Sequence, residues 1–305
     1  MPQGDRAFGF GPMRAVSALL DLWRPRQRPL PLSRLAGGDR ARAEAAVRAL
    51  AVAVPLADRV LLCRSLGRHK LLVDAADLTH GPHLAIDGFW EWWTTACLVR
   101  QLRPGARVVD AGAGYGYFTL LAAELVGPQG RVVAIEPHPR SAALLRRNIA
   151  LNGVTDRVEV VQAALAGPGA PLALPLLLQE GDPAGAHLRP EDLHGPAGAE
   201  EPQAGIKVPV QTLDHHAALR PDLVKLDLCG AEEAAWDGMQ QLLSECPAVR
   251  LLLNFSAERC RAPERLLDAM ARRFPLRRLA ADGTPRPVTA KELLATGDAM
   301  LFLAR

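Results

Sequence analysis

The residues best suited to chemistry lie in one short segment, where an acid and three alternating glycines follow an apolar run. The run over residues 107–110 ends at Asp110, and Gly112, Gly114 and Gly116 come directly after it. Glycine is needed where a backbone must approach a ligand closely or adopt a positive φ. A turn of this composition at the end of a strand is typical of a site for a nucleotide-like ligand.

The spacing of these glycines distinguishes between two such ligands. A dinucleotide turn, G-x-G-x-x-G, needs its third glycine three residues after the second. Counted from Gly112 and Gly114, that position holds Tyr117. The turn reads D-x-G-x-G-x-G instead, which favours S-adenosylmethionine (SAM) and argues against an NAD-dependent oxidoreductase.

Residues at the ends of neighbouring strands complete the expected cofactor site. Glu136 ends the next apolar run, 20 positions after Gly116, where a carboxylate can accept hydrogen bonds from both ribose hydroxyls of an adenosyl group. Asp110 is expected to face the amino acid end of the cofactor, directly or through water. The helix after the turn would present its N-terminus to the methionine carboxylate. Ala163, at the end of the third run, is expected at the edge of the adenine.

Methyl transfer to a hydroxyl also requires a group that removes the proton, and four side chains are candidates. Asp227 ends a strand beside the expected sulfonium, and Glu232 lies in the first turn of the next helix. His215 and His216 lie in a loop before that strand. The simpler interpretations are a cofactor contact or cap for Asp227, a favourable helix N-terminal position for Glu232, and an incidental exposed pair for the histidines. Cys229 could be reactive near a helix N-terminus, but we interpret it as a small buried residue.

From residue 107 onward, the elements that must position these residues alternate as strand, turn and helix. This alternation predicts a parallel sheet with right-handed crossovers. Strands are predicted over residues 107–110, 132–136, 158–163, 206–211, 222–228 and 249–255, with a final antiparallel pair at 276–280 and 299–304. Helices are predicted over residues 119–125, 141–152, 231–243, 262–272 and near 291–295. Residues 166–205 are crowded with Pro, Gly and Ala, which predicts a long loop that serves as a lid, a substrate loop or an insert.

The N-terminal segment, residues 1–67, is expected to form a helical cap that shapes the acceptor site or a dimer contact. Residues 1–40 are rich in Pro and Arg, which we interpret as a solvated linker. Residues 40–66 carry apolar residues at helical spacing around a central proline, which predicts two helices. A short strand is predicted over residues 70–73, and a further helix is predicted to begin near Trp90.

Composition and cysteine spacing restrict the class of protein. A net charge of +3 over 305 residues gives no sign of a nucleic-acid partner. No apolar run approaches the roughly 20 residues of a membrane span, and the N-terminus lacks the layout of a signal peptide. Five scattered cysteines without a C-x-x-C pair indicate a reducing compartment and neither a disulfide nor a zinc framework. We therefore expect a cytoplasmic protein without metal, nucleic-acid or membrane partners.

Several segments resemble the FkbM-type family of SAM-dependent methyltransferases, over roughly residues 68–305. The glycine turn alone indicates only the broad class. More specific are Gly88-Phe89-Trp90-Glu91, Ala134-Ile135-Glu136-Pro137, Asn148-Ile149-Ala150-Leu151-Asn152, Val210-Gln211-Thr212-Leu213-Asp214 and, most diagnostic, Val224-Lys225-Leu226-Asp227-Leu228-Cys229-Gly230-Ala231-Glu232.

This resemblance implies an α/β, Rossmann-like domain over residues 68–305, with a seven-stranded, mostly parallel sheet whose last strand is antiparallel. It implies SAM as the methyl donor, S-adenosylhomocysteine (SAH) as the product, and O-methylation of a small molecule, a glycan or a natural product. It also implies that Glu91 lies near the methionine end of SAM. Tyr115, Pro137 and Asp227 are expected among the cofactor contacts.

Two positions depart from the family pattern. Cys229 stands where the family commonly has an acid, and Asn254 stands where a glutamate commonly ends the fifth strand. The loss of two carboxylates weakens the case for a divalent metal, which needs several hard oxygen ligands, and it removes two possible bases. Two alternatives to O-methylation therefore stay open: N-methylation of a peptide or amide side chain, and a SAM-fold binding protein without catalysis.

Overall fold

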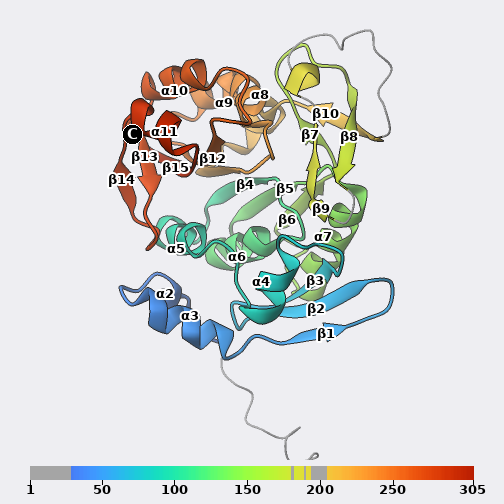
Figure 1. The fold of residues 1–305 in the computed structure, drawn as a ribbon. Coiled ribbons are helices and arrows are strands. Elements are labelled where there is room, and N and C mark those ends of the chain that lie inside the picture. Colours follow the sequence, from blue (N-terminus) through green and yellow to red (C-terminus); the bar gives the residue numbers. More distant parts are fainter. Residues whose placement is uncertain (1–28, 180–181, 189, 194–204) are drawn as a thin grey trace, which may run out of the picture.

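The computed structural model describes residues 29–305 apart from 180–181, 189 and 194–204 (Figure 1). Its centre is an eight-stranded sheet in the order β14-β13-β15-β12-β11-β4-β5-β6. The strands are β4 (Arg107–Ala111), β5 (Arg131–Ile135), β6 (Val158–Val161), β11 (Leu223–Leu226), β12 (Arg250–Ser256), β13 (Arg277–Leu279), β14 (Pro285–Pro287) and β15 (Asp298–Leu303).

The expected mostly parallel α/β sheet is confirmed, but its strand number is eight rather than seven. The strands from β12 to β6 run parallel, and β15 is antiparallel to β12. The additional strand, β14, pairs antiparallel with β13 at the edge of the sheet. Its sequence, Pro-Arg-Pro, gives no strand signal, because proline cannot donate to a ladder and is tolerated only at such an edge.

The register of the central strands brings the polar strand ends to one edge. Asp110 on β4 pairs with Lys225 on β11 and with Ala134 on β5. Because these strands are parallel and in register, the residues that follow them, including Glu136 and Asp227, emerge at the same carboxyl edge. Ligands of open parallel sheets bind at this edge.

Helices cover both faces of the sheet, because alternate strand residues are apolar and buried on opposite sides. One face is covered by α5 (Trp92–Gln101), α6 (Tyr117–Val126) and α7 (Pro139–Leu151), and the other by α8 (Glu232–Asp237), α9 (Gln240–Glu245), α10 (Pro263–Ala271) and α11 (Ala290–Thr296). The single helix predicted over residues 231–243 is interrupted after Asp237. At that point the Gly238 carbonyl accepts a hydrogen bond from the Asp214 amide, at 2.9 Å, instead of continuing a helix. No helix among the described residues is long and apolar enough to cross a membrane.

The N-terminal part is not the purely helical cap that was expected. It contains α2 (Leu32–Leu35), α3 (Arg40–Arg48), α4 (Gly81–Ile86) and an antiparallel sheet of β1 (Ala53–Pro55), β2 (Val60–Ser65) and β3 (His69–Asp74). The second helix predicted within residues 40–66 is therefore wrong. Asp58 and Arg59 adopt positive φ values of 60° and 57°, which turn the chain into a hairpin, and short apolar runs do not distinguish strand from helix. The expected division at residue 67 falls between β2 and β3, which pair along their length.

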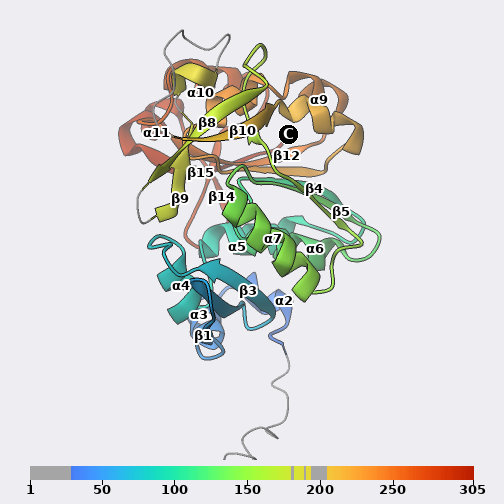
Figure 2. The same ribbon diagram turned by 90° about the vertical axis from the view of Figure 1, so that its right-hand side faces the viewer.

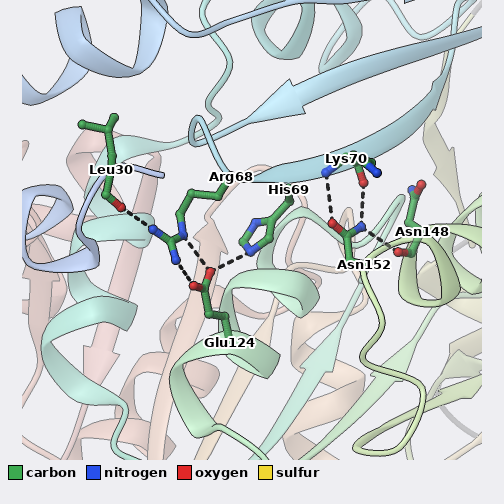
Figure 3. A network of polar contacts seen from close by, with 7 residues as sticks. All are labelled: Leu30, Arg68, His69, Lys70, Glu124, Asn148 and Asn152. Carbon is green, nitrogen blue, oxygen red and sulfur yellow. Dashed lines mark hydrogen bonds and ion pairs between the residues drawn. The ribbon is translucent and has the colours of Figure 1, made fainter. Parts of the chain in front are cut away.

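Asparagine side chains join β3 to α7 (Figure 3). Asn148 accepts from the Leu72 amide at 2.7 Å and donates to the Leu72 carbonyl at 2.9 Å. One turn later, Asn152 makes the same pair of bonds with Lys70, at 3.0 and 2.7 Å. The two side chains thus satisfy the outer backbone groups of an edge strand. Asn148 also donates to the Tyr115 carbonyl at 2.8 Å, which ties the glycine turn to the N-terminal sheet.

The segment expected to be a long loop, residues 166–205, instead contains two strands. A four-stranded sheet, in the order β7-β10-β8-β9, lies on the opposite side of the central sheet from the N-terminal part (Figure 2). Its strands are β7 (Ala164–Leu165), β8 (Ala173–Gln179), β9 (Asp182–His187) and β10 (Ile206–Gln211), followed by the short 3-10 helix η2 (Leu213–Leu219). Leu174 and Leu176 are buried because β8 pairs with β10, a long-range contact that the local composition does not reveal.

Candidate active site

A cavity opens at the carboxyl edge of the central sheet, above the ends of β4, β5 and β11. Most residues predicted for the cofactor line it: Gly112, Gly114, Tyr115, Glu136, Pro137, Ala163 and Asp227. The remaining walls come from outside the central sheet. The N-terminal part contributes Asp77, His80 and Trp90, and the four-stranded sheet contributes apolar residues such as Leu176.

Two glycines of the turn are required for different reasons. A Cβ at Gly112 would lie 1.7 Å from the Asp227 carbonyl oxygen, so the ends of β4 and β11 could not approach each other with any other residue there. A Cβ at Gly114 would meet no atom within 4 Å, because this residue borders the open cavity. Both have positive φ, 74° and 54°. Gly112 therefore allows the ends of β4 and β11 to approach closely, and Gly114 leaves space for a ligand next to the backbone.

Glu136 is a buried carboxylate whose remaining acceptor sites suit a diol. Its Oε2 accepts from the Gly114 amide at 2.8 Å, and its Oε1 accepts from the His138 amide at 2.9 Å. Burial raises the pKa of Glu136 to about 7, although these two amides favour the charged form. Since a carboxylate has about four acceptor positions, capacity remains for two further donors. Glu136, Gly114 and the cavity between them fit the ribose of an adenosyl cofactor.

Lys225 is a buried cation between two carboxylates. Its Nζ lies 3.4 Å from Asp110 Oδ1 and 3.5 Å from Asp227 Oδ2. Burial alone would lower the pKa of Lys225, but Asp110 and Asp227 outweigh burial and raise it. Asp110 also accepts from the Thr119 hydroxyl at 2.6 Å and does not line the cavity. The predicted cofactor residue Asp110 therefore faces the protein interior, where it helps to hold Lys225.

Asp227 is fixed through both oxygens. Oδ1 accepts from the Asn254 amide at 2.8 Å, and Oδ2 faces Lys225. Burial would raise the pKa of Asp227, but Lys225 and Asn254 outweigh burial and lower it. Where the family commonly has a glutamate, this chain has Asn254. Asp227 therefore has a hydrogen-bond donor beside it instead of a second negative charge. An acid with a lowered pKa is a weak base, so Asp227 is better suited to orient or attract a cation than to take a proton.

The other three candidates for catalysis, Glu232, His215 and His216, do not line the cavity. Glu232 is buried and accepts from the Leu228 and Gly230 amides, at 2.7 and 2.9 Å. It supports the turn in which Cys229 adopts a positive φ of 52°. His215 is exposed on η2 and contacts Thr212.

Cys229 lines the cavity but has the properties of a neutral thiol. Burial raises its pKa to about 12, and the neighbouring Asp227 acts in the same direction. Because the thiolate is the reactive form of cysteine, the side chain is not activated as a nucleophile. The interpretation of Cys229 as a small space-filling residue agrees with this environment.

Glu91 lies in a neighbouring cavity of about 360 Å³, together with Asn254 and Arg259. It precedes α5 with a positive φ of 37° and accepts from the Thr94 hydroxyl at 2.8 Å. Burial and then Asp227 raise the pKa of Glu91 to about 7. Because Asn254 is bonded to Asp227, this pair lies between the two cavities.

Sequence reasoning missed the contribution of the N-terminal part. Asp77 and His80 lie three residues apart in a turn, close to the Trp90 that the motif analysis singled out. In the sequence, the only sign of these residues is an acid and a histidine three positions apart, before an aromatic residue. No local feature indicates that they reach the edge of the central sheet. No group of three or more potential metal ligands of the His, Cys, Asp and Glu types occurs among the described residues.

Comparison with known proteins supports the same class of site. The model of the methyltransferase FkbM domain matches residues 110–270, more than half of the 305-residue chain. A segment of 59 residues is 49% identical to a protein-L-isoaspartate O-methyltransferase of Aeropyrum pernix, and it covers 19% of this chain and 23% of that protein. A segment of 88 residues is 39% identical to a catechol O-methyltransferase of Mycobacterium tuberculosis, and it covers 29% of this chain and 38% of that protein.

These matches span well under half of the length of the curated relatives. Among solved structures, the O-methyltransferase from Bacillus cereus in complex with SAH has a TM-score of 0.37 and 14% identity, over 70% of this chain and 80% of that one. The SAM-dependent O-methyltransferase from Thermotoga maritima has a TM-score of 0.36 and 15% identity, over 70% and 64%. Superpositions this loose carry no inference about the present chain.

Proposed function

Because the chain belongs to the FkbM family of methyltransferases, which use SAM as methyl donor, we propose that it methylates a hydroxyl oxygen of a small molecule, a glycan or a natural product. The bound donor supplies a methyl group that is already activated by a sulfonium. The protein must therefore align the acceptor oxygen with that carbon and provide for the acceptor proton.

The cofactor assignment within this proposal rests on residues of this chain. Glu136 would accept from the ribose hydroxyls, Ala163 would border the adenine, and the backbone at Gly114 would approach the cofactor closely. Asp227, whose lowered pKa keeps it ionised, would attract the positively charged end of the donor.

The shape and lining of the cavity favour a compact acceptor. The cavity that begins at Gly114 and Glu136 continues to Asp227, His80 and Trp90 as a single space. An acceptor near His80 and Trp90 would lie beside aromatic and polar side chains, a lining typical of sites for small ligands. Two of the partial relatives, a catechol O-methyltransferase and a protein-L-isoaspartate O-methyltransferase, are named for methylation of oxygen.

A screen of acceptors tests this proposal. Purified protein is incubated with SAM and with panels of hydroxylated sugars, phenols and peptides, and products are read as a mass gain of one methyl together with SAH. Glu136→Gln serves as the cofactor-site control. A methylated hydroxyl compound supports the proposal. Methylation of a peptide nitrogen alone would replace it by the N-methylation alternative, and SAH binding without any product would favour a non-catalytic protein.

A further inference from the structure

The cavity contains a histidine that is held by a buried acid. His80 directly precedes α4, and its Nδ1 lies 3.2 Å from Asp77 Oδ2. Asp77 is 1% exposed, and its Oδ1 accepts from the amides of Thr79 and His80 at 2.9 and 2.7 Å. Asp77 therefore has a fixed position, and it fixes one nitrogen of the imidazole in turn.

The rest of the His80 ring is oriented by Trp90 and open to the cavity. The two ring centroids are 4.5 Å apart and the planes meet at 65°, an edge-to-face contact. His80 lines the cavity that also contains Asp227 and Glu136. Its second nitrogen, Nε2, has no hydrogen-bond partner within the described part of the chain. With the proton on Nδ1 shared with Asp77, the Nε2 lone pair is available to a ligand.

Three acids from different elements contribute negative charge that favours the protonated form of this histidine. They are Asp77 in its own turn, Glu91 before α5 and Asp227 after β11, and Asp227 is itself paired with Lys225. Burial would lower the pKa of His80, but these carboxylates outweigh burial and raise it. The same charges stabilise the imidazolium that proton uptake would form. Asp227 is less suited to accept a proton, because its pKa is lowered.

We propose that His80, positioned by Asp77, is the general base that accepts the proton of the acceptor hydroxyl. This inference rests on the proposed O-methylation. The acceptor oxygen forms a bond to the methyl carbon while the carbon–sulfur bond breaks, and that electron pair goes to sulfur. The O–H bond breaks and its proton goes to Nε2 of His80. The products are the methyl ether, SAH and an imidazolium that afterwards releases its proton to water.

The fold contains a matched control for this dyad. His83 also packs against Trp90, with ring centroids 5.2 Å apart, and its Nδ1 also lies 3.2 Å from an aspartate, Asp87. In the second pair, however, His83 is exposed and Asp87 half-buried, and neither is part of the cavity lining. His83→Gln and Asp87→Asn therefore repeat the chemical change of His80→Gln and Asp77→Asn without reaching the site.

The test combines kinetics with a measurement that needs no acceptor. Using the hydroxyl acceptor found in the screen, His80→Gln should lower kcat by about 10²–10⁴-fold, with SAH affinity unchanged. Activity requires neutral imidazole, so wild-type kcat should rise with pH through the raised pKa of His80. Asp77→Asn should lower kcat and move this rise to lower pH. The control variants should keep the wild-type rate and profile.

Histidine-ring ¹H–¹⁵N NMR of the protein with SAH then gives the tautomer of His80 directly. The neutral ring should carry its proton on Nδ1, and this preference should disappear in Asp77→Asn. A proton on Nε2 would overturn the proposal even if no acceptor were found, as would a His80→Gln variant that retains wild-type kcat. Absence of any methylated product together with an Nδ1–H tautomer would contradict the proposed O-methylation and not the dyad geometry.

Discussion

Three acids in and beside the site differ in charge state because their partners differ. Glu136 has backbone amides as partners and no ion pair with any described residue, so burial raises its pKa to about 7. Asp227 has Lys225 and Asn254, which lower its pKa. Glu91, close to Asp227, again has a raised pKa of about 7. Near neutral pH the site therefore combines one firmly ionised acid with two that titrate.

The titration of Glu136 predicts how cofactor binding depends on pH. The ionised carboxylate is the stronger acceptor for ribose hydroxyls, so SAH affinity should rise as pH increases through about 7. Glu136→Gln should weaken SAH binding by about tenfold to a hundredfold, as expected for a bond to a charged group, and should remove this rise. Calorimetry at pH 6 and pH 8 measures both effects. Equal pH dependence in the two proteins would contradict the assigned role.

Lys225 predicts a second residue-level effect, on stability. Lys225→Met would leave the buried Asp110 and the half-buried Asp227 without their cation, which should cost about 3–5 kcal/mol in the free energy of unfolding at pH 7. Without Lys225 the folded pKa of Asp227 loses the cation that lowers it and rises, so the stability cost of the variant should be smallest at low pH and grow as pH increases. Urea unfolding at pH 5 and pH 7 measures this. Lys207→Met on the exposed part of β10 is the control, and a similar loss in both variants would refute the prediction.

Part of the site was predictable residue by residue. Gly112, Gly114 and Glu136 follow apolar runs directly, and their positions at the sheet edge depend only on local order along the chain. Glu232 and His215 could not be placed, because the direction of a side chain after a strand depends on the turn that follows. His80 was missed because a segment of the N-terminal part brings it to the cavity through tertiary contacts.

At the scale of elements, two glycines of the turn between β4 and α6 should respond differently to substitution by alanine. Gly112→Ala would force its Cβ onto the Asp227 carbonyl and should strongly destabilise the protein. Gly114→Ala meets no atom and should cost only about 1 kcal/mol for its positive φ, yet it should weaken SAH binding. Gly105→Ala has the same open surroundings and a φ of 83° but lies away from the cavity.

Urea unfolding and SAH calorimetry of these three variants separate strain from ligand contact. Gly114→Ala and Gly105→Ala should be about equally stable, and only the former should lose affinity. If Gly114→Ala bound SAH like the wild type, the backbone at this position would not approach the ligand.

A helix or strand can be predicted from the sequence when the residues within it determine its structure. The central strands are buried on both faces, so their continuous apolar runs identify them. The strand β8 depends on pairing with β10, a distant segment. The strands β1 and β2 pair with each other and with the adjacent β3, but their apolar runs are too short to distinguish a strand from a helix. The local sequence therefore indicates a loop at β8 and a helix at β1 and β2.

At the scale of the whole molecule, the N-terminal part is attached by a polar cluster around Glu124 on α6 (Figure 3). Glu124 accepts from Arg68, including Nε at 2.9 Å, and lies 2.9 Å from His69. Burial would raise the pKa of Glu124, but His69 and Arg68 outweigh burial and lower it to about 2. This contact holds the part of the chain that supplies His80 and Trp90 to the cavity.

The lowered pKa of Glu124 predicts that the protein loses stability in acid. Its stabilising contribution should be complete above the unfolded pKa of about 4.5 and be lost as pH falls toward 2. Glu124→Gln should therefore lower the free energy of unfolding at pH 7 by about 2 kcal/mol, with a smaller difference at pH 3. Urea unfolding at both values measures it, with the exposed Glu258→Gln as control. A constant difference would show that the ion pair is not the cause.

The central claim is that the glycine turn and Glu136 bind an adenosyl methyl donor. Calorimetric titration of the full chain with SAM, SAH and NAD tests it most directly. Heat of binding with SAM and SAH, its reduction in Glu136→Gln, and none with NAD are the predicted result. Binding of NAD, or no heat with either sulfur nucleoside, would contradict the account.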